Sequence, residues 1–112
     1  MEVQMRFGYY GGGFNPPHVA HVMVAAYALS VARLDKLWVV PCWKHAFAKD
    51  HDLVSYKHRM EMAKLAFAPL SNVVVSGVEK QFNAQYTVEV IECMKRLKPR
   101  DEWVLIVGSD NK

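Results

Sequence analysis

The sequence predicts an α/β domain in which a parallel β-sheet lies between two layers of helices. Short apolar runs that suit strands alternate along the chain with longer stretches that suit helices, the pattern of repeated βα units. The strand runs are apolar without interruption, as expected when both faces of each strand are buried. The 112 residues, 52% of them hydrophobic, are enough for one domain with its own core.

Four strands are predicted, each followed by a residue that ends a strand or opens a turn. The first ends near Tyr10, and the others cover residues 37–40, 73–75 and 103–107. The residues that stop them are Gly11, Pro41, Gly77 and Gly108. Glycine and proline at these places favour short, clearly bounded strands.

Three main helices are predicted from N-capping residues and apolar side chains at helical spacing. The predicted caps are Asn15, Ser55 and Thr87. Pro16 suits the first position of the first helix, which is expected to end near Arg33, while Pro69 and Pro99 follow the other two. The expected apolar faces are Val19, Val22, Met23, Ala26 and Leu29, then Tyr56, Met60, Ala63 and Phe67, then Val90, Ile91, Met94 and Leu97.

Charge and cysteine usage exclude several classes of protein. The chain has 14 basic and 11 acidic residues, a net charge of +3, which is too small an excess to indicate a nucleic-acid or membrane binder. Cys42 and Cys93 have no CxxC spacing, which favours a reducing cytosol. The longest apolar stretch, 22–29, is far shorter than the ~20 residues of a membrane helix. We therefore expect a soluble cytoplasmic protein whose partners include anionic small molecules.

The segment 42–54 is predicted to be a polar loop. It follows the carboxyl end of a predicted strand and carries Trp43, Lys44, His45, Lys49, Asp50, His51 and Asp52. Open α/β sheets bind their ligands at this edge. Its basic side chains could neutralise a phosphate or only keep the loop soluble, and both readings remain open.

The strongest functional signal is the segment 11–21, Gly-Gly-Gly-Phe-Asn-Pro-Pro-His-Val-Ala-His. Glycines after a strand allow close approach of a ligand, and the N-terminus of the next helix offers N–H donors and a positive dipole end. His18 and His21 are three residues apart, so they share one face near that N-terminus. The segment predicts a phosphate site. Zinc is the other reading of the pair, and a third ligand is not evident.

Two common phosphate motifs are excluded, because Pro16 stands where GxGxxG requires glycine and no Gly-Lys-Ser/Thr is present. The segment instead resembles the GGTFDPxHxGH motif of the HIGH-type nucleotidyltransferases. Further matches are most similar to nicotinate-nucleotide adenylyltransferases: Pro41-Cys42-Trp43-Lys44-His45 to a proline-containing loop, His58-Arg59-Met60 to an Arg-Met helix start, Gln85-Tyr86-Thr87 to Ser-Tyr-Thr, and Gly108-Ser109-Asp110 to Gly-x-Asp.

The resemblance implies a Rossmann-like open sheet with strand order 3-2-1-4. It also implies transfer of AMP from ATP to nicotinate mononucleotide, with release of pyrophosphate and with Mg²⁺ accompanying ATP. His18, His21 and Lys44 are the catalytic residues that it implies. The implied nucleotide-binding residues are Gly12, Gly13, Phe14, Asn15, Lys49, Arg59, Tyr86, Thr87, Gly108 and Asp110. Among these, Arg59 could also be a surface side chain, and Thr87 a simple helix cap.

Within the motif, Gly13, Asn15 and Ala20 replace the family's usual threonine, aspartate and glycine. The family's C-terminal Ser-Ser/Thr-x-x-Arg segment is not found, so residues 1–112 are expected to be a nucleotidyltransferase-like domain without its C-terminal part. A sheet ending after the fourth strand would expose an apolar edge, which predicts a homo-oligomer. The alternatives are a pantetheine-phosphate adenylyltransferase, a cytidylyltransferase, or a non-catalytic nucleotide-binding or oligomerising remnant.

Overall fold

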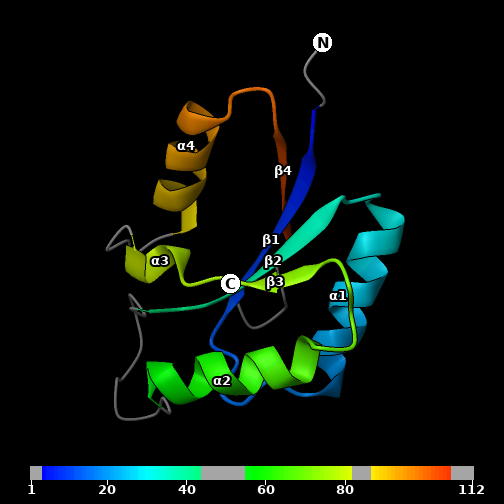
Figure 1. Cartoon of the computed structure of the whole chain (residues 1–112), viewed down its shortest axis with the longest axis vertical. Coiled ribbons are helices and arrows are strands. Elements are labelled where there is room, and N and C mark those ends of the chain that lie inside the picture. Colours follow the sequence, from blue (N-terminus) through cyan, green and yellow to red (C-terminus); the bar gives the residue numbers. More distant parts are fainter. Residues whose placement is uncertain (1–3, 44–54, 82–86, 107–112) are drawn as a thin grey trace.

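A computed structural model describes residues 4–43, 55–81 and 87–106, with no side-chain placement for residues 87 and 88. Strands and helices alternate along the chain as predicted (Figure 1). In chain order they are β1 (Arg6–Gly12), α1 (Val19–Val31), β2 (Lys36–Pro41), α2 (Tyr56–Phe67), β3 (Val73–Val75), α3 (Val78–Gln81), α4 (Thr87–Leu97) and β4 (Glu102–Ile106).

The strands form one parallel sheet in the order β3-β2-β1-β4, which confirms the expected order. In the register, Tyr9 of β1 lies between Trp38 of β2 and Leu105 of β4. The chain passes from β1 through β2 to β3 in one direction and then crosses back to β4. Right-handed crossovers therefore place α1 and α2 on one face of the sheet and α4 on the other (Figure 1).

Side chains of successive strand residues alternate between two cores. On the face covered by α1 and α2, Tyr10, Leu37 and Val39 pack with Ala25 and Phe67. The opposite face has its own cluster, made by Tyr9, Val40, Val78 and Val90, with Trp38, Ile91, Met94 and Trp103 packed around it. The unbroken apolar strand runs are thus explained, because both faces are covered.

The start of α1 differs from the prediction that Asn15 caps it and Pro16 opens it. The cap residue is His18, whose backbone is extended, and the Asn15–Pro16 peptide bond is cis. A residue that precedes proline is driven out of the helical region, so Pro17 prevents Pro16 from being the first helical residue, and Asn15 then has no helix start to cap. No further proline follows Pro17 in this segment, and α1 begins two residues later, at Val19.

The predicted apolar face of α1 is partly wrong. Val19 and Met23 are 72% and 66% exposed, and Ala26 is exposed as well. The inward side chains are Val22, Ala25, Ala28, Leu29 and Ala32. Because α1 is apolar nearly all the way round, spacing alone could not select its buried face. In α4, Leu97 at the final position is 66% exposed, so the buried stripe of that helix ends at Met94.

Other boundaries fall close to the predictions. Ser55 caps α2 by accepting a hydrogen bond from the N–H of His58, as expected. Thr87 is the first residue of α4 rather than its cap, and the short helix α3 has no counterpart among the predicted elements. The end of the fourth strand at residue 107 lies outside the described residues. Among the described helices, none is long and apolar enough to cross a membrane.

Candidate functional site

The glycine-containing loop lies at the carboxyl edge of the sheet, between the end of β1 and the start of α1. Phe14 in this loop has a φ of 46°, in the left-handed region that a phenylalanine rarely adopts. Its ring is only 3% exposed and packs edge-on against Tyr10 and Phe67, with centroids 5.2 and 6.0 Å away. Burial of this ring fixes the loop, because another backbone conformation would withdraw it from the core.

The two histidines of the motif meet at the N-terminus of α1. His18 is the cap and His21 is the third helical residue, and their ring centroids are 4.0 Å apart. The backbone N–H of His18 donates to Nδ1 of His21 over 3.0 Å. In the neutral ring Nδ1 is then an acceptor, so the proton lies on Nε2. His21 is thereby prepared to donate a hydrogen bond from Nε2.

The helix terminus adds backbone donors next to this pair. The carbonyl of His18 accepts from the N–H groups of His21 and Val22, at 2.9 and 3.3 Å. The N–H groups of Val19 and Ala20 precede these and have no intrahelical carbonyl to reach. With the positive end of the helix dipole, they make this edge favourable for an anion.

Arg59 lies beneath the glycine loop. Its side chain is 2% exposed, so the alternative that it is a surface residue is wrong. Its Nη1 donates to the carbonyl oxygens of Gly13 and Cys42, at 3.1 and 2.8 Å, and lies 3.7 Å from Sγ of Cys42. The guanidinium therefore contacts the backbone of the loop on the side that faces the protein interior.

Glu79 is a buried carboxylate that the sequence analysis did not single out. It is 4% exposed and accepts hydrogen bonds from the hydroxyl of Tyr9 at 2.9 Å and from the N–H of Trp43 at 3.3 Å. Burial raises the pKa of Glu79, while these two hydrogen bonds and the charge of Arg59 oppose that effect. Its position soon after β3, at the carboxyl edge of the sheet, is the one signal that could have identified it.

Tyr56 and Cys42, both partly buried, also lie next to Arg59. Cζ of Arg59 lies 5.6 Å from the centroid of the Tyr56 ring, within cation–π range. Burial is the main cause that raises the pKa of both Tyr56 and Cys42. The neutral forms of the phenol and the thiol are therefore favoured next to the guanidinium.

The structure thus brings together Gly12, Gly13, Phe14, Asn15, His18, His21 and Arg59 at one edge of the sheet. Five predicted site residues lie outside the described residues: Lys44, Lys49, Tyr86, Gly108 and Asp110. Thr87 is placed only as the first residue of α4. Within the part of the chain that the structure describes, no three His, Cys, Asp or Glu side chains form a metal-binding group, so the zinc reading gains no support.

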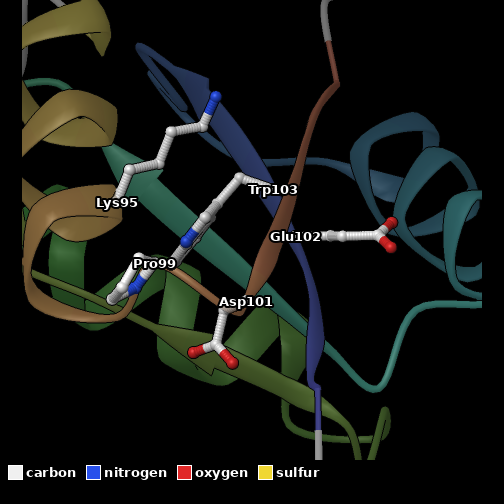
Figure 2. Close-up of a pocket in the computed structure, with 5 residues that line it drawn as sticks. All are labelled: Lys95, Pro99, Asp101, Glu102 and Trp103. Carbon is white, nitrogen blue, oxygen red and sulfur yellow. The ribbon is translucent and has the colours of Figure 1, made fainter.

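An open pocket of about 460 Å³ lies at the other end of the sheet, between the end of α4 and the start of β4. Lys95, Pro99 and Trp103 lie on one side of β4, and Glu102 projects to the other side (Figure 2). Ligands of open α/β sheets bind beyond the carboxyl ends of the strands, and this pocket lies at the amino end of β4. It is therefore separate from the candidate site.

Comparison with known proteins identifies the family. The model of the family described as cytidylyltransferase-like matches residues 9–112. The chain belongs to this family. Its relatives include a probable nicotinate-nucleotide adenylyltransferase of Albidiferax ferrireducens. The two sequences are 43% identical over 106 residues, which make up 94% of this chain and 53% of the relative. Another protein of the same description, from Anaeromyxobacter dehalogenans, is 38% identical over 89% of this chain and 54% of its own length.

The fold is also shared with solved members of that group. The nicotinic acid mononucleotide adenylyltransferase of Plasmodium falciparum, solved in complex with APC, superposes with a TM-score of 0.78. That match has 23% sequence identity and covers 96% of this chain and 52% of the other. The chain spans about half the length of the curated relatives that it matches.

Proposed function

We propose that this chain forms the nucleotide-binding part of a nicotinate-nucleotide adenylyltransferase, which transfers AMP from ATP to nicotinate mononucleotide and releases pyrophosphate. The observation that carries the proposal is the His18–His21 pair at the N-terminus of α1, whose rings lie together beside the backbone N–H groups of the helix start. The names of the relatives support the same reaction.

In this reaction a phosphate oxygen of the mononucleotide attacks the α-phosphorus of ATP, and the bond to the β-phosphate oxygen breaks. Catalysis of such a transfer depends mainly on positioning and on stabilisation of charge. His18 and His21 donate to the phosphate oxygens on which negative charge develops. The backbone of Gly12, Gly13 and Phe14 lies close to the phosphates, because two of these residues lack side chains.

Mg²⁺ enters with ATP as part of the substrate. The described residues contain no cluster of carboxylates that could hold the ion by itself, and the buried carboxylate of Glu79 already binds Tyr9 and Trp43. Binding through substrate phosphates and water is the usual mode for Mg²⁺ in nucleotide sites.

Other assignments in the proposal follow the resemblance. Lys44 and Lys49 neutralise the triphosphate, Tyr86 and Thr87 border the pyridine nucleotide, and Gly108 and Asp110 meet the adenosine ribose. We also propose a reducing, cytoplasmic location, which the free thiols of Cys42 and Cys93 support. Self-association stays a prediction, and the 51% exposure of Leu105 on β4 is consistent with it.

The test is pyrophosphate release from ATP and nicotinate mononucleotide, with and without Mg²⁺. His18→Ala is expected to abolish the release, while Lys64→Met, a change at an exposed position of α2, is expected to leave it unchanged. Full activity of His18→Ala would refute the assigned role. Pantetheine phosphate as acceptor and CTP as donor test the other nucleotidyltransferase readings. Calorimetric binding of ATP without turnover would indicate a nucleotide-binding module.

A further inference from the structure

We infer that Arg59 and Glu79 are a positioning pair that fixes the glycine loop after β1 against the segment after β2. They are the two charged side chains that are buried among the described residues, at 2% and 4% exposure. Hydrogen bonds from these two side chains to both segments support the inference. Its consequence for anion binding rests on the proposed function.

Arg59 joins the two segments through a single nitrogen. Nη1 donates to the carbonyl of Gly13 at 3.1 Å and to the carbonyl of Cys42 at 2.8 Å. The same segments are joined directly by a hydrogen bond from the N–H of Cys42 to the carbonyl of Gly12, at 2.8 Å. Beyond this backbone hydrogen bond, Arg59 thus joins the segments that follow β1 and β2 through the carbonyl of the next residue, Gly13.

The position of Arg59 also sets the direction of a backbone donor. In a trans peptide the C=O and the following N–H point in opposite directions. The carbonyl of Gly13 points to Arg59, so the N–H of Phe14 points away from it. Among the described residues no acceptor is present for that N–H. An anion bound at the loop can therefore use the N–H of Phe14.

Glu79 fixes the second segment in the same manner. The carbonyl of Cys42 points to Arg59, and the N–H of Trp43, in the same peptide, donates to Oε1 of Glu79 at 3.3 Å. The other carboxylate oxygen accepts from the hydroxyl of Tyr9 at 2.9 Å. The peptide between Cys42 and Trp43 is therefore held from both sides, by a cation on its oxygen and by a carboxylate on its nitrogen.

The chemistry of Arg59 and Glu79 indicates that they hold the two segments in place and do not merely fill space in the core. Burial of a guanidinium and a carboxylate has a large desolvation cost, and apolar side chains of similar volume would fill the same space without that cost. A guanidinium offers several donors in a fixed plane, whereas a lysine ammonium is a flexible point charge. Two carbonyls from different segments are thus held at a defined separation by arginine and poorly by lysine.

Amide hydrogen exchange measured by NMR on the 112-residue chain tests the inference without any ligand. In Arg59→Met, the N–H of Cys42 is expected to exchange at least about tenfold faster. In the original chain the segment can open only if the hydrogen bonds of Arg59 break as well, and the variant lacks them. Amides at the paired centre of β1 and β2 keep their rates. Arg59→Lys gives an intermediate rate, and Lys64→Met, on the exposed side of α2, changes nothing.

An unchanged rate at Cys42 in folded Arg59→Met would overturn the role of Arg59. If that variant does not fold, the comparison of Arg59→Lys with the original chain decides in the same way. Glu79→Met is the second variant, and it is expected to speed exchange at the N–H of Trp43 by about tenfold, since the acceptor is lost. Glu79→Gln keeps an acceptor oxygen and restores protection. Equal rates in Glu79→Met and the original chain would overturn the role of Glu79.

Calorimetry with Mg-ATP and with tripolyphosphate separates this inference from the proposed function. Arg59→Met is expected to weaken both affinities about tenfold, the size of one well-placed hydrogen bond to an anion. If the original chain binds neither probe, the proposed function fails, and the exchange rates still decide whether the pair positions the segments. Equal affinities in Arg59→Met and the original chain would refute the link to anion binding.

Discussion

Nδ1 of His21 accepts a hydrogen bond from the backbone N–H of His18, 3.0 Å away. Nδ1 thus stabilises the start of α1, and the proposed function assigns Nε2 to a substrate phosphate. The two roles of His21 can be separated by substitution.

His21→Asn is expected to keep the first role and lose the second, because Oδ1 of asparagine can replace Nδ1, whereas its Nδ2 takes the place of the ring carbon Cδ2 and does not reach the place of Nε2. His21→Ala loses both. We expect His21→Ala to reduce the free energy of unfolding by about 1 kcal/mol, the usual value of a capping interaction, and His21→Asn by less. Both variants should bind Mg-ATP about tenfold more weakly. Urea unfolding and calorimetry give the two values, and equal stability of the variants would contradict the capping role.

Glu79 predicts a specific dependence of stability on pH. Burial raises its pKa above the ordinary value of 4.5, so the folded chain holds this proton more tightly than the unfolded chain. The stabilising contribution of Glu79 is therefore complete below the unfolded pKa and is lost as pH rises through the folded pKa. In urea unfolding between pH 4 and pH 8, Glu79→Gln should gain stability relative to the original chain across that window.

Glu61→Gln is the matched control, because Glu61 is exposed on α2. Its stability should follow the original chain at every pH. If Glu79→Gln and Glu61→Gln give parallel curves, the carboxylate of Glu79 does not titrate at a raised pKa in the folded state.

Gly8 of β1 is expected to resist enlargement. A Cβ atom at this position would lie 2.5 Å from Cδ1 of Leu34 and 2.6 Å from Cδ1 of Leu37. Both are ends of side chains that can shift, so Gly8→Ala should cost about 1–3 kcal/mol of unfolding free energy rather than abolish folding. In the double variant with Leu34→Ala the two costs should be less than additive. Strict additivity would mean that Leu34 is not the obstacle.

The two sides of α1 should respond differently to substitution. Met23 is 66% exposed and Ala25 is fully buried, although Met23 has the larger apolar side chain. Met23→Gln should change the free energy of unfolding by less than about 0.5 kcal/mol. Ala25→Leu should cost about 1–3 kcal/mol or more, because the added atoms must displace packed neighbours. A larger change in the free energy of unfolding for Met23→Gln than for Ala25→Leu would contradict the assignment of Ala25 to the buried face of α1 and of Met23 to the exposed face.

Much of the fold follows from local signals. The strand runs, the Ser55 cap and the glycine segment were identified because each depends on neighbours within a few residues. The predicted Asn15 cap was wrong for an equally local reason, because Pro17 keeps Pro16 out of the helical region and the helix therefore starts later. The buried face of α1 required knowledge of what the helix packs against, because its apolar residues surround the axis.

The polar support of the candidate site could not be predicted in the same way. Arg59 contacts Gly13 across 46 positions of sequence, and Glu79 contacts Tyr9 across 70. A charged residue in a helix is usually at the surface, and only the folded arrangement shows that these two are buried beneath the loops. The histidines differ, because three-residue spacing at a helix start already brings their side chains together.

The contact between Arg59 and Sγ of Cys42, at 3.7 Å, makes this thiol a chemical reporter. Thiols react as thiolates, and the raised pKa of Cys42 keeps it in the unreactive form. Alkylation of Cys42 should therefore be slow and should accelerate when the surrounding segments open, because solvent then relieves the burial that raises its pKa. The rate of alkylation at Cys42 measures, without an engineered cysteine or a ligand, how often the native protein opens there.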